Sequence, residues 1–99
     1  MRVVDHEPHA WFLFQEGDDL LLDVNCSHRA VGYSVLIPLG LDEVAAYARH
    51  GRPFLNQIAH DIQNAGPGSV LQRRDVSAEF AQVCSAAIQE WIERDIGAT

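Results

Sequence analysis

The sequence predicts an α+β fold in a single domain over residues 1–99. We expect an antiparallel β-meander of three to four strands followed by two or three helices packed on one face. Two observations lead to this prediction. Runs of β-favouring residues separated by turn residues fill the first forty positions, and from residue 41 hydrophobic residues recur every three or four positions. Strands that all precede the helices favour an antiparallel sheet over an alternating parallel one.

Three segments are predicted as strands: residues 9–15, 20–26 and 30–37. The first contains the aromatic run WFLF and ends in the turn sequence EGDD, whose Gly17 can adopt a positive φ. In the second, every other residue is apolar, which is typical of a strand with one buried face. The short connections predict hairpins. Residues 2–5 are expected to add a brief fourth strand.

The second half of the chain reads as helical. Residues 41–64 place hydrophobic residues on one helix face, and Pro53 predicts either a kink or the start of a separate helix. The sequence AGPGS at 65–69 ends this region, and residues 70–73 are expected as an edge strand.

The last helix has the clearest pattern. Its apolar residues, from Phe80 to Ile92, repeat at three and four positions over nearly four turns. Ser77 is the expected N-cap, with Glu79 in the first turn and Arg94 in the last, where each complements the helix dipole.

Charge argues against a nucleic-acid partner. The chain has fourteen acidic residues and seven basic ones, all of them arginine, which gives a net charge of −7. A nucleic-acid-binding protein needs a basic face to neutralise phosphates. The acidic surplus instead fits solubility or association with a basic protein.

No feature of the sequence predicts export or membrane insertion. Residues 1–8 lack the basic start and apolar run of a signal peptide, and no apolar run approaches the length of a membrane helix. The two cysteines have no CxxC spacing and are expected to be reduced. We therefore expect a cytoplasmic protein.

No catalytic motif is present, and we expect neither enzyme activity nor a cofactor nor a metal. His6 and His9 flank Pro8, which disfavours the helix on which two histidines at this spacing would converge. Cys26 with His28 and Asp23 has the residue types of an activated thiol. The alternation of its strand favours Cys26 as a small buried residue instead.

One sheet face is expected to remain open. If the helices cover a single side, Trp11, Leu13 and Leu21 lie on the other, beside Asp23 and the acidic turn. An exposed aromatic patch with an acidic rim needs a cover. The cover could be the N-terminal residues 2–8, a second copy of the chain or another protein.

Three strings carry a resemblance to a known family: WFLFQEG at 11–17, LDVNCSH at 22–28 and VGYS at 31–34. Together they resemble the immunity proteins of contact-dependent growth inhibition and related bacterial polymorphic toxin systems. The resemblance implies a cytoplasmic protein that binds a cognate toxin domain, commonly a nuclease with a basic cleft, and occludes its active site. It implies no catalytic residues.

From the resemblance and the charge we derive a partner-binding hypothesis. The expected toxin-facing residues are Trp11, Glu16, Asp18, Asp19 and Asp23. The alternative is a small dimeric regulatory or accessory protein that pairs through the same sheet face and has no toxin partner.

Overall fold

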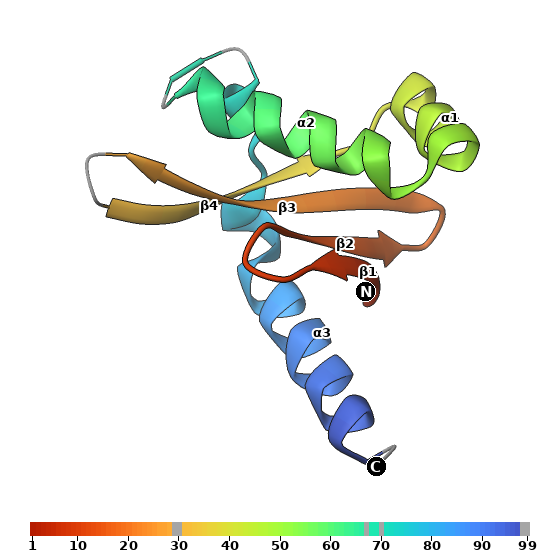
Figure 1. The fold of residues 1–99 in the computed structure, drawn as a ribbon. Helices are drawn as coiled ribbons and strands as arrows, with labels where there is room; N and C mark the ends of the chain where they lie inside the picture. The colour runs from red at the N-terminus through yellow and green to blue at the C-terminus, as the bar shows by residue number, and fades with distance from the viewer. Residues whose placement is uncertain (29–30, 67, 70, 98–99) are drawn as a thin grey trace.

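The computed structural model describes all residues except 29–30, 67, 70 and 98–99. Four antiparallel strands form one sheet in the order β1-β2-β3-β4 (Figure 1). They are β1 (Arg2–Glu7), β2 (Trp11–Glu16), β3 (Asp19–His28) and β4 (Val31–Pro38). The predicted meander is confirmed, including its brief first strand.

The helical half contains α1 (Leu41–His50), α2 (Arg52–Ala65) and α3 (Ser77–Gly97). The region 41–64 therefore forms two helices, divided at Gly51, whose φ of 70° is a conformation that favours glycine. Pro53 lies in the first turn of α2, where its missing N–H costs no hydrogen bond. The α+β class is confirmed.

The edge strand expected at residues 70–73 is wrong. Gln72–Arg74 form a short 3-10 helix, and residue 70 lies outside the described residues. Local bonds satisfy this backbone, because Ser69 accepts from the N–H groups of Arg73 and Gln72. The buried Gln72 side chain accepts from the Tyr33 hydroxyl and donates to the Ile62 carbonyl, which ties the turn to β4 and α2.

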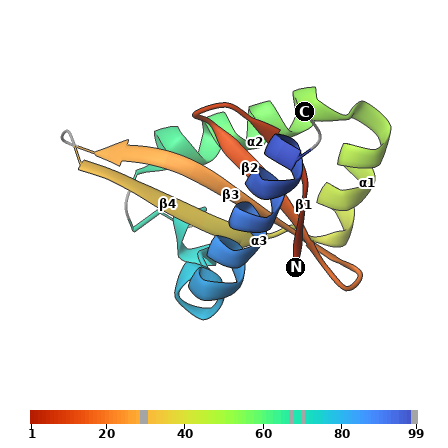
Figure 2. The same ribbon diagram turned by 90° about the horizontal axis from the view of Figure 1, so that it is seen from below.

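The helices do not share one face of the sheet, and this part of the prediction is wrong. α1 and α2 lie on one side and α3 on the other (Figures 1 and 2). α3 crosses the strands from β4 to β1. The physical reason is that the strands carry large apolar side chains on both faces, so each face needs a cover.

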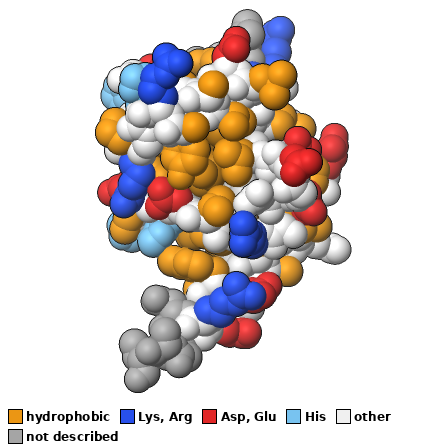
Figure 3. All heavy atoms as spheres, turned by 90° about the vertical axis from the view of Figure 1, so that its right-hand side faces the viewer, with side chains coloured by type: hydrophobic (Ala, Val, Ile, Leu, Met, Phe, Trp, Pro, Cys, Tyr) orange, Lys and Arg blue, Asp and Glu red, His pale blue; other side chains and the backbone are white. Residues whose placement is uncertain are grey.

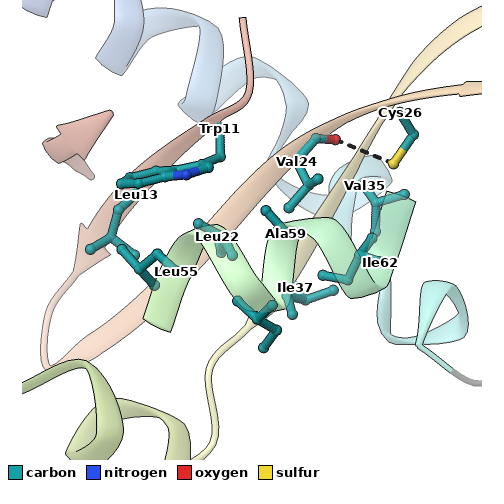
Figure 4. Packing of buried hydrophobic residues seen from close by; sticks show 11 residues of the cluster. Trp11, Leu13, Leu22, Val24, Cys26, Val35, Ile37, Leu55, Ala59 and Ile62 are labelled. Atoms are coloured by element: carbon teal, nitrogen blue, oxygen red, sulfur yellow. Dashed lines mark hydrogen bonds between the residues drawn. The ribbon is translucent and has the colours of Figure 1, made fainter. Parts of the chain in front are cut away.

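The first core lies between the sheet and α2 (Figure 4). Trp11 stands opposite Val24, and Leu13 opposite Leu22, so these side chains share one sheet face. The buried members from the sheet are Trp11, Leu13, Leu22, Val24, Cys26, Val35 and Ile37, and those from α2 are Leu55, Ile58, Ala59 and Ile62. Burial of each large side chain contributes about 1.5–3 kcal/mol.

The second core lies between the sheet and α3. It contains Phe14, Leu21 and Leu36 from the strands and Ala87 from α3. Phe12, opposite Asp23 in the sheet, contacts Trp91 edge to face with ring centroids 5.7 Å apart. The two cores together bury the middle of the sheet on both sides.

The start of α3 is tied to the edge strand β4. The main-chain N–H of Leu36 donates to Asp75 Oδ1 at 2.9 Å, and its carbonyl accepts from the N–H of Val76 at 2.7 Å. The N–H of Ser77 also donates to Asp75 Oδ1, at 2.9 Å. Ser77 is therefore the first residue of the helix and not the expected N-cap, because the Asp75 carboxylate supplies the capping acceptor.

Within the described residues, no helix combines the length and the apolar character needed to cross a membrane.

Candidate functional site

The β2–β3 turn presents three exposed carboxylates, Glu16, Asp18 and Asp19, which we call the acidic turn. Glu16 and Asp19 are opposite each other in the ladder, and Gly17 makes the turn with a φ of 59°. Like charges opposite each other in a sheet repel. The Glu16 carboxylate lies 3.3 Å from the amino group of Met1, the one cation with which a described ion pair joins this turn.

Trp11 is not exposed, and its expected place on an open sheet face is wrong. Only 1% of its surface is accessible, and its indole N–H donates to Asn56 Oδ1 at 2.8 Å. The Arg52 guanidinium lies 5.8 Å from the ring centroid. Leu13 and Leu21 are also buried, under α2 and α3 respectively. The cover is thus the chain's own helices, and not residues 2–8 or a second molecule.

Asp23 lies apart from the acidic turn. On the α3 side of β3 the order is Asp19, Leu21, Asp23, because side chains alternate along a strand. Leu21, 3% exposed beneath α3, separates the two carboxylates. Four residues of strand correspond to about 13 Å. The structure therefore does not bring the five expected partner-binding residues together: three form the turn, one is buried, and Asp23 has a different environment.

That environment is an open cavity of about 240 Å³ between the sheet and α3, which we call the Asp23 cavity. Asp23 lines it from β3, and Ser34 and Leu36 line it from β4. The α3 residues around it are Ser77, Ala81, Cys84, Ser85 and Ile88. Three of them, Ser77, Ala81 and Ser85, are small residues at intervals of four on one helix face, and this leaves the space open.

The charge of Asp23 is poorly stabilised. Burial, followed by repulsion from Asp75, raises the pKa of the Asp23 carboxyl from 3.8 to about 6. No described residue donates a hydrogen bond to this carboxylate or forms an ion pair with it. Near neutral pH the cavity therefore contains a carboxylate without a partner from the described part of the chain.

A second hollow, of about 500 Å³, lies beside Cys26. His9, Asn25, Gln63 and Asn64 complete its lining, and Gln63 Nε2 donates to the Asn25 carbonyl at 2.7 Å. Cys26 itself is 7% exposed, and its thiol lies 3.7 Å from the Val24 carbonyl oxygen (Figure 4). Burial is the main cause that raises the pKa of the Cys26 thiol, which disfavours the nucleophilic thiolate.

The activated-thiol arrangement of Cys26, His28 and Asp23 is not formed. Asp23 and Cys26 point to opposite faces of β3, since their positions differ by three and side chains alternate along a strand. The side chain of His28 lies outside the described residues. The other thiol, Cys84, lies 3.5 Å from the Met1 sulfur, and burial raises its pKa to about 11.

Across the residues that the structure describes, no group of three or more His, Cys, Asp or Glu side chains could hold a metal ion. His6 packs against aromatic rings, with its centroid 4.5 Å from Trp91 and 5.6 Å from Phe12.

No family model, curated protein or solved structure was found to match this chain. The Asp23 cavity was not predicted, although the small residues at 77, 81 and 85 are a signal for it in the sequence. What could not be read from the sequence is that they face Asp23.

Proposed function

We propose that this protein is an immunity protein that binds a cognate toxin domain with a basic surface and occludes its active site. The observation that carries the proposal is the acidic turn, which concentrates three exposed carboxylates at the end of a hairpin in a chain of net charge −7. The proposed place of action is the cytoplasm of the cell that makes the toxin, and a nuclease is the proposed toxin class.

The distribution of the arginines supports this role for the turn. The described ion pairs of Arg52, Arg74 and Arg94 use acids elsewhere, namely Asp5, Glu7, Glu43 and Glu90. Glu16 pairs with the Met1 amino group, whereas no described ion pair uses Asp18 or Asp19, so these two carboxylates direct a negative field toward solvent. Such a field attracts a basic cleft and raises the association rate by 10- to 1000-fold, to an extent that falls with salt.

The proposal assigns a binding role and no catalytic residue. A cleft that binds phosphates presents cationic side chains, and carboxylates can occupy the phosphate positions through charge-assisted hydrogen bonds. Trp11 has no part in this surface, because α2 covers it.

The test begins with the partner. The tagged protein is expressed together with its neighbouring genes in the native host, and a toxin domain that remains bound is identified by mass spectrometry. The isolated toxin domain is then assayed with and without this protein. The proposal requires inhibition at equimolar protein, with a 1:1 complex in solution. A toxin domain that binds but keeps its full activity would refute neutralisation.

The role of the acidic turn is tested with a charge-matched pair of variants. The triple variant Glu16→Gln, Asp18→Asn, Asp19→Asn should lower the association rate about 10-fold and flatten its salt dependence. The control removes three exposed acids from helices, with Asp61→Asn, Glu79→Gln and Glu93→Gln. Equal rates for the two variants would show that overall charge, and not the turn, attracts the toxin.

A dimeric accessory protein remains the second candidate because of a different surface. The sheet face first expected to pair is covered by helices, so that version is wrong. However, Leu41 is 91% exposed at the start of α1, and α1 has no buried residue. Figure 3 shows hydrophobic side chains gathered on the side of the molecule where α1 lies. Analytical ultracentrifugation decides: a dimer that Leu41→Gln dissociates favours this candidate, and a monomer at 100-fold above working concentration excludes it.

A further inference from the structure

Asp23 is the one acidic or basic residue among those that line the Asp23 cavity. Asp23 supplies the carboxylate, and Ser34, Ser77 and Ser85 also line the cavity. The Ser77 hydroxyl donates its proton to Asp75 Oδ2 at 3.0 Å, which leaves its oxygen as an acceptor. Asp75 adds a second negative charge nearby, since its repulsion contributes to the raised pKa of Asp23. The polar atoms of the cavity are therefore suited to accept hydrogen bonds from a cation.

The rest of the lining is apolar. It consists of Leu36 from β4 and of Ala81, Cys84 and Ile88 from α3, and its one side-chain heteroatom is the Cys84 sulfur, which lies 3.5 Å from the Met1 sulfur. A bare metal ion fits this surface poorly, because Ca²⁺ and Mg²⁺ need six or more oxygen ligands and a single carboxylate is available here. An organic cation on a hydrocarbon chain fits both parts of the lining.

We propose that the Asp23 cavity binds a primary ammonium group on an unbranched apolar chain, as a free alkylamine or a lysine side chain presents it. The three N–H donors of the ammonium match the Asp23 carboxylate and neighbouring serine oxygens, and the hydrocarbon chain contacts Leu36 and Ile88. A volume of about 240 Å³ accommodates such a group together with its waters, which take about 30 Å³ each. The site is independent of the acidic turn and does not require a toxin partner.

The test is a titration of the ¹⁵N-labelled protein with n-butylammonium chloride at pH 7.5 and constant ionic strength, followed by amide chemical shifts. We expect saturable shifts, in the millimolar range, confined to the strands and the first half of α3 around the cavity. n-Butanol, which has the same chain without the charge, should bind at least 10-fold more weakly. Equal binding of n-butanol would overturn the proposal.

Two variants with a matched control assign the site. Asp23→Asn should weaken butylammonium binding at least 10-fold, whereas Asp19→Asn, which removes an exposed charge from the same strand, should leave it unchanged. Ala81→Leu keeps the carboxylate and fills the cavity, so it should also abolish binding. Dispersed spectra of all three variants verify folding. Unchanged affinity in Asp23→Asn, or absence of saturable shifts in the unmodified protein, would overturn the proposal.

A third ligand distinguishes the two sources of the ammonium group. Nα-acetyl-lysine-N-methylamide carries the same amine on a peptide unit. If it binds as tightly as butylammonium, the cavity mouth admits a protein side chain and the source is a lysine. If only butylammonium binds, the source is a free amine. Either result supports the shared chemistry, and failure of both ligands refutes it without bearing on toxin neutralisation.

Discussion

Replacement of Asp23 by asparagine should stabilise the protein at neutral pH. The pKa of Asp23 is raised from 3.8 to about 6 in the folded protein, first by burial and then by Asp75. A carboxyl whose pKa is higher when folded binds its proton more tightly in the folded state than in the unfolded state. The free energy of unfolding therefore falls as the pH rises from about 4 to about 6, and Asp23 destabilises the fold above that range. Asparagine keeps the shape and removes the charge.

The size of the effect follows from the shift. About 2 pKa units correspond to about 3 kcal/mol at 1.36 kcal/mol per unit. Because the cavity is open to water, we expect solvent to reduce this to about 1–2 kcal/mol. A gain of that size raises the Tm of a 99-residue domain by about 5–15 °C. At pH 4 the gain should shrink to about 0.5 kcal/mol or less, since Asp23 is then protonated in the folded protein.

Urea denaturation at pH 7.5 and pH 4.0, followed by tryptophan fluorescence, measures the gain in the free energy of unfolding of Asp23→Asn at each pH. Asp19→Asn is the control, because it removes an exposed carboxylate from the same strand and should change the free energy of unfolding by less than about 0.5 kcal/mol. The reasoning is refuted if Asp23→Asn fails to stabilise the protein at pH 7.5, or if its gain is the same at both pH values.

Three further predictions concern the thiols, the tryptophan and the link to α3. Both Cys26 and Cys84 have raised pKa values, so iodoacetamide at pH 7.5 should modify the folded protein at least about 10-fold more slowly than the urea-unfolded chain; rapid labelling of either thiol would contradict this. Trp11→Phe removes a buried indole and its hydrogen bond to α2, and should cost about 2–4 kcal/mol in urea denaturation; a cost below 1 kcal/mol would mean that the ring is not packed as described. Asp75→Ala leaves the N–H of Leu36 without its acceptor and should speed hydrogen exchange at that amide while lowering stability by about 1–3 kcal/mol; unchanged exchange would contradict the assigned bond.

The order and type of the elements could be predicted from the sequence. Alternation in β3 and the turn sequence EGDD mark the central hairpin, and three-to-four spacing marks the helices. These signals are local, because each depends on side chains within one element. The 3-10 helix at Gln72–Arg74 lacked such a signal, since its bonds to Tyr33 and Ile62 join distant parts of the chain.

The layer arrangement was mispredicted although part of its signal was present. In WFLF, Trp11 and Leu13 face α2 whereas Phe12 and Phe14 face α3, so the run is apolar on both sides. A continuous apolar run is typical of a strand covered on both faces. The polar residues Asp23 and Asn25 at alternate positions of the next strand suggested a wetter face instead. On β3 that face is polar at Asp19, in the acidic turn, and again from Asp23 toward the β3–β4 hairpin, and between them it is apolar at the buried Leu21.

The stability and binding effects of Asp23 are linked, and together they test the electrostatic argument more strictly than either does alone. An ammonium ion that binds only the ionised carboxylate competes with the proton, so its binding must lower the apparent pKa of Asp23. If bound butylammonium lowers the pKa of Asp23 from about 6 to 3.8, the protein should bind butylammonium about 100-fold more tightly at high pH than at low pH. If Asp23→Asn stabilises the protein but butylammonium does not bind, the carboxylate is destabilising and the proposed ligand is wrong. If butylammonium binds the unmodified protein and Asp23→Asn brings no stability, the cavity is already well solvated and the gain on binding comes from the hydrocarbon chain, which n-butanol would then share.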